Sequence, residues 1–363
     1  MKAIKAALKN TVLLIVSIFF AFLFLEGLAR YIIKAWPFEQ PTITYNLTSK
    51  DKNLRWRFGP GSGLNSLGLR NREIGRKRAN SFRILYLGDS LVWSGETSSG
   101  ALYTQTIESN LNEALGYRNT RIEVINAGIP GYTTYQEVEF LKQYGLDMQP
   151  DLVILGFVFN DLYYKYLSKP TKNNILGREP EVQLNRFNTD TRLGAVFARS
   201  YVAHRVYYAL ENILKKLRGY PYFPFEYRTD FCLAWKKHGW KHAKRLIKEC
   251  KDLLEERKIK LILVVYPMRD QVDDRYLEID ADYVLYPQKR VKEICSAYDI
   301  HYFDLTIAIH SNGGIQLYRD YLHFNEKGND IVAAVITDYL IANWTDQFYD
   351  VRLPLVYQNR YYR

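Results

Sequence analysis

From Arg83 onward, hydrophobic residues alternate between short continuous runs and runs with helical spacing. Each continuous run is closely followed by Gly, Pro, Asn or Asp, which is typical of strands buried on both faces of a sheet. The runs cover Arg83–Leu87, Ile122–Ile125, Leu152–Leu155, Ile259–Tyr266 and His301–Phe303. Between the first two, Ile107, Leu111 and Leu115 recur every four residues, the spacing of one helix face. Strands that alternate with helices predict an α/β domain built on a parallel sheet.

The same spacing predicts further helices between the later strands. One surrounds Val138 and Leu141, a Lys-rich amphipathic helix covers about 233–257, and another covers Pro287–Tyr298. A closing helix covers 326–343, with Asn325 as its N-cap. In an open parallel sheet the ligand binds beyond the carboxyl ends of the strands, so the residues just after each strand are the candidates for chemistry.

The N-terminus carries a different pattern, a long apolar run preceded by Lys2, Lys5 and Lys9. The run extends from Thr11 to Leu25 and, with the apolar residues up to position 33, reaches the roughly 20 residues that a spanning helix needs. Lysines ahead of a span predict a cytoplasmic N-terminus, with the rest of the chain in the periplasm or at the cell surface. A cleaved signal peptide is the alternative, but no small-x-small cleavage site follows the run.

These patterns divide the chain into four parts. Residues 1–35 are predicted to be a membrane anchor, and residues 36–80 a polar, Gly-rich connector. Residues 81–345 form the α/β domain, interrupted at about 165–230 by a Tyr-rich insertion with helical periodicity between Val202 and Leu217. Residues 346–363 are a C-terminal tail.

Charge and composition exclude several classes of function. The net charge is +11, but the basic residues are scattered and no nucleic-acid-binding signature occurs, so the charge favours an acidic membrane surface. His238 and His242 stand four apart without the Glu of a zinc-protease motif, and the sequence predicts no metal and no cofactor. Cys232 and Cys250 are predicted to share one helix, about 27 Å apart and too far for a disulfide.

Two short segments carry candidate catalytic residues. Ser90 follows the first strand in the turn Gly88-Asp89-Ser90, where a hydroxyl can be presented at the sheet edge. Asp320 and His323 stand three apart on a late loop. A serine is a poor nucleophile without a base, histidine is that base near neutral pH, and a carboxylate on its second nitrogen fixes the tautomer.

Two other loops offer hydrogen-bond donors for the oxyanion that forms during acyl transfer. The second strand is followed by Gly128-Ile129-Pro130-Gly131, where the backbone N–H of one of the two glycines could project as a donor. The third strand is followed by Asn160, whose amide is a donor. The candidate nucleophile, the oxyanion donors, and the base with its carboxylate therefore all lie in predicted loops. These loops share one edge of the sheet.

On these blocks the chain resembles the SGNH (GDSL) hydrolase family over roughly residues 83–343. Its four blocks are matched by Gly88-Asp89-Ser90-Leu91, Asn126-Ala127-Gly128-Ile129-Pro130-Gly131, Asn160-Asp161 and Asp320-Tyr321-Leu322-His323. The resemblance implies a flavodoxin-like three-layer α/β/α fold and metal-free ester hydrolysis. It implies Ser90 as nucleophile, His323 as base and Asp320 as its partner, with the N–H groups of Ser90 and Gly131 and the Asn160 amide as oxyanion hole. The family usually has Gly two residues before the Asn, where this chain has Val158.

We therefore expect a membrane-anchored serine esterase that acts on O-acyl or acetyl esters of a carbohydrate or a lipid. Two alternatives remain. An O-acyltransferase acting on a cell-surface glycan would use the same triad with a sugar hydroxyl in place of water. A non-catalytic binding protein would keep the fold, although the intact Ser90, His323 and Asp320 argue against it.

Overall fold

The computed structural model describes residues 2–35, 53–54, 56–61, 63–93, 95–115, 120–162, 187, 191–197, 200–217 and 231–348. The chain forms two compact units. One combines Met1–Thr42 with Gly177–Phe223, and the other combines Ile43–Leu176 with Pro224–Arg363. Much of the predicted connector, insertion and tail lies outside the described residues, and the division into four parts stays a prediction.

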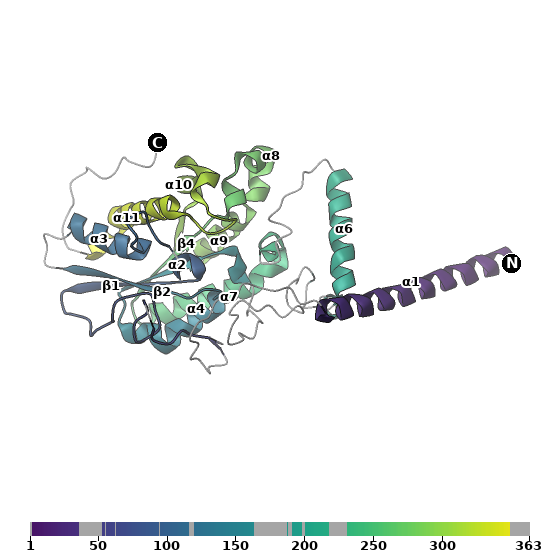
Figure 1. Cartoon of the computed structure of the whole chain (residues 1–363), viewed down its shortest axis with the longest axis horizontal. Helices are drawn as coiled ribbons and strands as arrows, with labels where there is room; N and C mark the ends of the chain where they lie inside the picture. The colour runs from purple at the N-terminus through teal and green to yellow at the C-terminus, as the bar shows by residue number, and fades with distance from the viewer. Residues whose placement is uncertain are drawn as a thin grey trace. The chain divides into compact units, whose positions relative to one another are not determined.

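The larger unit is built on a five-stranded parallel sheet (Figure 1). Its strands are β1 (Ser81–Gly88), β2 (Arg121–Gly128), β3 (Leu152–Phe157), β4 (Lys260–Val265) and β5 (His301–Asp304). All five predicted runs are strands, in the spatial order β2-β1-β3-β4-β5. This is the flavodoxin-like order, so the predicted fold class is confirmed.

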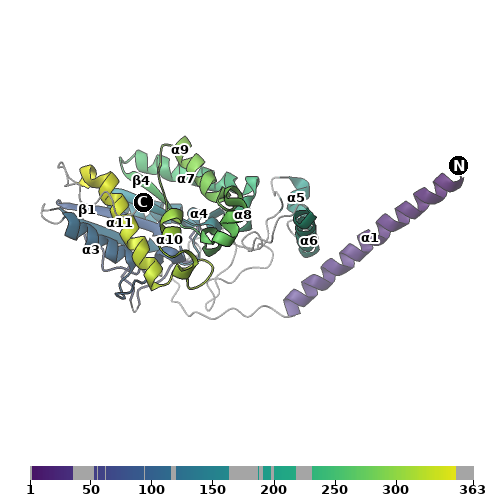
Figure 2. The ribbon, with the colours of Figure 1, turned by 90° about the horizontal axis from the view of Figure 1, so that it is seen from above.

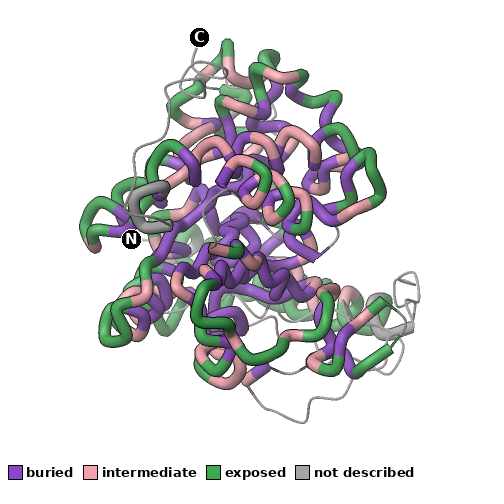
Figure 3. Tube along the Cα trace, turned by 90° about the vertical axis from the view of Figure 1, so that its left-hand side faces the viewer, coloured by how far each residue is buried: buried purple, intermediate pink, exposed green. Residues whose placement is uncertain are grey.

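Helices cover both faces of this sheet and complete three layers. On one face α3 (Tyr103–Leu115) packs against α11 (Glu326–Phe348), and on the other α4 (Thr134–Phe140) packs against α7 (Trp240–Glu255) (Figures 1 and 2). A further helix, α9 (Tyr286–Ala297), contacts β4 and β5. Every residue of the central strand β3 is buried, and Figure 3 shows the buried trace concentrated between the helical layers. Nearly continuous burial explains why β1, β3 and β4 read as apolar runs, whereas the edge strand β5 is only partly buried.

The start of the closing helix follows the prediction. The side-chain oxygen of Asn325 accepts a hydrogen bond from the Gly328 N–H at 2.9 Å, so the predicted N-cap of α11 is confirmed. This cap fixes the end of the loop that carries Asp320 and His323.

The segment before β4 differs from the prediction. A 3-10 turn at Cys232–Trp235 precedes α7, and the extended backbone of Lys236 (φ −115°, ψ 127°) separates the two. The prediction that Cys232 and Cys250 share one helix is therefore wrong. All three cysteines lie in the described part of the chain, are buried and form no disulfide there. Among the helices that were not predicted are α8 (Asp274–Val284) and α10 (Thr306–Ser311).

The smaller unit contains α1 (Lys2–Ala35), α5 (Arg192–Phe197) and α6 (Tyr201–Leu217). The segment Ala7–Ile32 of α1 is apolar enough to cross a membrane, and none of it is buried within the structure. Its 26 residues correspond to about 39 Å of helix, more than the roughly 30 Å of a hydrocarbon core. A signal sequence shares these properties. The helix α6 lies where the insertion shows its predicted helical periodicity.

Candidate active site

Ser90 opens the short helix α2 (Ser90–Trp93) at the carboxyl end of β1. The preceding Asp89 holds this turn, since its side chain accepts from the Leu91 N–H at 2.9 Å and its carbonyl accepts from the Trp93 N–H at 3.0 Å. A Cβ on Gly88 would lie 2.3 Å from Cγ2 of Val92, so the turn requires glycine there. The turn places the Ser90 hydroxyl at the rim of the sheet.

The structure brings Ser90, His323 and Asp320 together as the sequence predicts. The Ser90 Oγ lies 2.8 Å from Nε2 of His323, although the two residues stand 233 positions apart. Nδ1 of the same ring lies 2.8 Å from Oδ2 of Asp320. The second carboxylate oxygen, Oδ1, accepts from the backbone N–H groups of Leu322 and His323 at 2.8 and 2.7 Å. Hydroxyl, imidazole and carboxylate form one continuous chain of hydrogen bonds.

The carboxyl of Asp320 is held in its ionised form. Partial burial alone would raise its pKa, but hydrogen bonds from the His323 ring and from the His323 and Leu322 N–H groups outweigh burial. The pKa of Asp320 therefore falls well below its ordinary value. An ionised carboxylate at this position fixes the proton of the imidazole on Nδ1 and leaves Nε2 free to accept the proton of Ser90.

The glycine loop after β2 lies beside the Ser90 turn because β1 and β2 pair in register, Gly88 opposite Gly128. Gly131 has φ +75°, a left-handed conformation that favours glycine, and it is buried. Within the described part of the chain, the N–H of Gly131 forms no hydrogen bond. Gly128 has no room for a side chain, since a Cβ would lie 2.5 Å from the Trp93 nitrogen.

Asn160 follows β3 in a 3-10 turn, Phe159–Leu162. Its Nδ2 donates to Oδ2 of Asp89 at 3.0 Å, which ties the β3 loop to the turn that carries Ser90. Val158, at the position where the resembled family has Gly, is buried and donates its N–H to Oδ2 of Asp161 at 2.7 Å. The loop is thus stabilised by a carboxylate, and the side chain of Val158 is accommodated in the core.

Three buried carboxyls, those of Asp89, Glu137 and Asp161, lie behind these loops. Burial raises the pKa of each, and the proximity of Asp161 and Asp89 raises that of Glu137 further. Among the described residues, neither oxygen of Glu137 has a hydrogen-bond partner. The contact of Asp89 with Asn160 and the burial of Glu137 were not predicted. An acid in a helix ordinarily faces solvent, so the sequence carries no signal for Glu137.

We expect Glu137→Gln to stabilise the fold at neutral and alkaline pH. A carboxyl whose pKa is raised in the folded state destabilises that state as the pH rises above its ordinary value of 4.5, because the unfolded chain then loses the proton more readily. Glutamine carries no charge and needs no proton, so it avoids the cost of protonating the buried carboxyl, which we expect to be about 1–3 kcal/mol at pH 8. Thermal unfolding should show a gain over wild type that is largest at pH 8 and shrinks towards pH 4.

The exposed Glu113, on α3, supplies the matched control. Glu113→Gln should shift the unfolding temperature little at any pH. A Glu137→Gln variant that is less stable than wild type at pH 8 would show that Glu137 is ionised and paired in the folded protein. A gain that does not change with pH would show that folding does not raise the pKa of Glu137.

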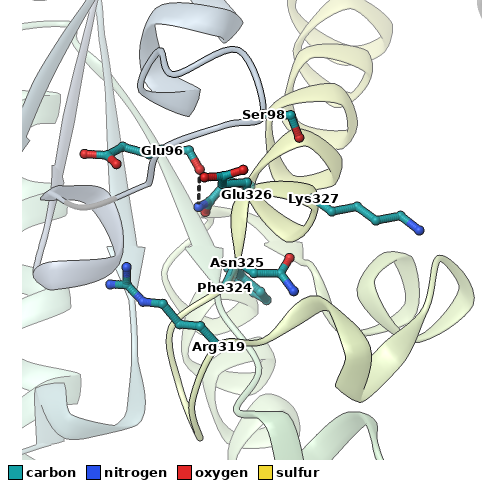
Figure 4. Close-up of a pocket in the computed structure, with 8 residues that line it drawn as sticks. Glu96, Ser98, Arg319, Phe324, Asn325, Glu326 and Lys327 are labelled. Carbon is teal, nitrogen blue, oxygen red and sulfur yellow. Dashed lines mark hydrogen bonds between the residues drawn. The ribbon is translucent and has the colours of Figure 1, made fainter.

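An open cavity of about 440 Å³ adjoins the loop that carries His323 (Figure 4). Arg319 and Phe324, which flank Asp320–His323, contribute to its lining. The other lining residues are Glu96, Ser98, Asn325, Glu326, Lys327 and Asn329. Charges of both signs and several hydroxyl or amide groups thus surround the cavity. Such a lining suits a polar, hydroxyl-rich molecule better than a hydrocarbon chain.

Comparison with known proteins gives one family and several solved structures. The model of the GDSL-like lipase/acylhydrolase family matches residues 86–331. A lipase/acylhydrolase from Enterococcus faecalis is 17% identical and has a TM-score of 0.40, over 72% of this chain and 96% of that one. An acetylxylan esterase from Geobacillus stearothermophilus is 16% identical with a TM-score of 0.42, over 70% and 92%. No curated protein matches the sequence.

The structural likenesses, with TM-scores below 0.5, do not decide the substrate. The family match is stronger evidence. The matched residues begin in β1, end in the first turn of α11, and include Ser90, Asn160 and His323. It also covers more than half of the chain. The chain therefore belongs to the GDSL-like lipase/acylhydrolase family and is a hydrolase that acts on ester bonds.

Proposed function

We propose that the protein is an extracytoplasmic serine esterase in which Ser90, His323 and Asp320 form the catalytic triad. The observation that carries the proposal is the continuous hydrogen-bond chain from the Ser90 Oγ through both ring nitrogens of His323 to Asp320. A hydroxyl 2.8 Å from a ring nitrogen is within reach of direct proton transfer. The carboxylate orients the ring and stabilises the imidazolium that forms.

The reaction follows from this geometry in two halves. The Ser90 Oγ attacks the ester carbonyl while Nε2 of His323 takes its proton, and the ring then returns that proton to the departing alcohol. The acyl group remains on Ser90. Water next attacks the acyl-enzyme, gives its proton to Nε2, and the carboxylic acid leaves as the proton returns to the Ser90 oxygen.

The oxyanion formed in each half requires donors. The proposed donors are the N–H groups of Ser90 and Gly131 and the side-chain amide of Asn160. Support for Gly131 comes from its buried N–H, which no described residue accepts. The Asn160 amide has two hydrogens, and the bond to Asp89 uses one of them. Asp89 thereby holds the amide in place and leaves the second hydrogen for the substrate oxygen.

The polar cavity lined in part by Arg319 and Phe324, the residues on either side of the Asp320–His323 segment, supports a substrate whose alcohol part is hydroxyl-rich, such as an O-acetylated carbohydrate. The apolar helix α1 supports attachment to a membrane with the N-terminus in the cytoplasm, because Lys2, Lys5 and Lys9 precede the span. An enzyme held there would act on acylated molecules of the cell envelope.

The test is product analysis with the full-length protein in detergent. Acetylated xylo- and manno-oligosaccharides, a triacylglycerol and p-nitrophenyl acetate are supplied one at a time, with and without a free oligosaccharide acceptor. We expect release of acetate from the acetylated oligosaccharides at a rate that the acceptor does not change. Acetyl transfer to the acceptor in place of acetate release would identify an O-acyltransferase, and no turnover of any ester would refute the proposal.

A further inference from the structure

The helix α6 exposes a continuous apolar stripe. The spacing of its members is four, three, one and three residues, which places them on one helix face. The stripe consists of Val206, Leu210, Ile213, Leu214 and Leu217. Each of these side chains is about half exposed or more, and Leu217 is 78% exposed. The preceding α5 adds exposed Leu193, Val196 and Phe197. Contiguous apolar surface of this kind marks a site of contact with another molecule or with lipid.

The start of α6 is bound to the apolar helix α1. The Glu26 carboxylate of α1 accepts hydrogen bonds from the Ser200 hydroxyl at 2.9 Å, from the Val202 N–H at 3.0 Å and from the Tyr201 N–H at 3.3 Å. Arg30, one turn further along α1, pairs with Glu26 at 2.8 Å. A carboxylate at a helix N-terminus satisfies the free N–H groups of the first turn and complements the helix dipole. The contact therefore fixes the start of α6 at one position along the axis of α1, at the level of Glu26.

That level lies in the last third of the candidate span, six residues before its end at Ile32. Lys9 and Glu26 are 17 positions apart in one helix, about 26 Å, close to the thickness of a hydrocarbon core. With Lys9 at the cytoplasmic edge, Glu26 lies near the opposite edge. In Figure 1, α6 runs across the direction of α1 and does not lie along it. A helix held there in that direction runs parallel to the membrane plane.

The charges beside the stripe favour lipid over a second copy of the chain. Arg205 and Lys216 are exposed and lie along one border of the stripe. A basic border next to an apolar face suits an anionic bilayer surface, because the face enters the acyl chains and the cations meet the headgroups. Two copies joined antiparallel through this face would bring the same cations together.

We propose that α5 and α6 form an interfacial element that lies in the outer leaflet of the membrane spanned by α1, with the apolar stripe turned into the lipid. The inference rests on the proposed membrane span. It gives the insertion a role in holding the hydrolase at the lipid surface, and it assigns Glu26 as the residue that sets the depth of α6.

The test places an environment-sensitive fluorophore at single engineered cysteines of the full-length protein in vesicles of phosphatidylglycerol and phosphatidylcholine. The native cysteines are buried and do not compete for label in the folded protein. Leu210→Cys reports on the stripe, Asn212→Cys on the opposite face of α6, and Phe20→Cys on the span. Retained ester hydrolysis shows that each variant is folded.

We expect strong quenching at position 210 by lipids with a nitroxide just below the headgroup, and several-fold weaker quenching at position 212. Position 20 should be quenched best by a nitroxide deep in the acyl chain. Deep quenching at 20 without quenching at 210 would overturn the interfacial element and leave the span intact. No lipid quenching at 20 would refute the span itself. A blue-shifted fluorophore at 210 that lipid nitroxides do not quench would show that protein covers the stripe, and would also overturn the inference.

Discussion

Ser90→Ala is expected to lower kcat/KM for p-nitrophenyl acetate by at least about 10⁴-fold, because no other group can form the acyl-enzyme. The change removes one oxygen from a partly buried side chain and the 2.8 Å contact with His323. The backbone turn stays, since Asp89 and Gly88 hold it without the hydroxyl. Stability should therefore change by less than about 1 kcal/mol.

A fluorophosphonate probe makes the same experiment chemically specific. The wild-type protein should be labelled on the peptide that contains Ser90, and Ser90→Ala should not be labelled. Ser66→Ala is the matched control, because Ser66 is exposed and its hydroxyl donates to Oε2 of Glu73 at 2.7 Å. Labelling of Ser90→Ala at another serine, or hydrolysis at the wild-type rate, would remove Ser90 from the mechanism.

The strands β1 to β4 could be predicted from the sequence because their residues are mostly buried and read as apolar runs, whereas the edge strand β5 is only partly buried. Their carboxyl ends then indicated where Ser90, Gly131 and Asn160 would gather. The short helix α8 escaped prediction for a related reason. It has a kink at Asp280 and buries only Val284, so it lacks the apolar stripe that helix prediction needs.

Contacts between loops could not be predicted in the same way. The pairing of Ser90 with His323 depends on where α11 packs against α3, which local patterns do not contain, and the resemblance to a family supplied it. The bond between Asp89 and Asn160 joins two loops that each read as an ordinary turn. The bond of Glu26 to the start of α6 joins segments 174 positions apart. The spacing of residues along the sequence predicts contacts within one helix or strand. It does not predict contacts between segments that are far apart in the chain.

Asp320→Asn is expected to lower kcat by about 10⁴-fold while KM changes little, since the carboxylate acts on the imidazole and not on substrate binding. The Asn oxygen can take the place of Oδ1 and keep the bonds from the Leu322 and His323 N–H groups. The amide nitrogen then replaces Oδ2 beside Nδ1 of His323. A donor there favours the tautomer with its proton on Nε2, which cannot accept the proton of Ser90.

The comparison with Asp320→Ala separates this effect from support of the loop. Alanine loses both the imidazole partner and the two backbone bonds, so it should cost activity and about 1.5–3 kcal/mol of stability, as expected for hydrogen bonds to a charged group. Asparagine should cost activity alone. If asparagine kept near wild-type kcat and only alanine were inactive, Asp320 would be a cap of the loop and His323 would act without a carboxylate partner. If one oxygen of Asp320 orients the imidazole and the other supports the loop, the two variants should lose kcat equally, and only Asp320→Ala should lose stability.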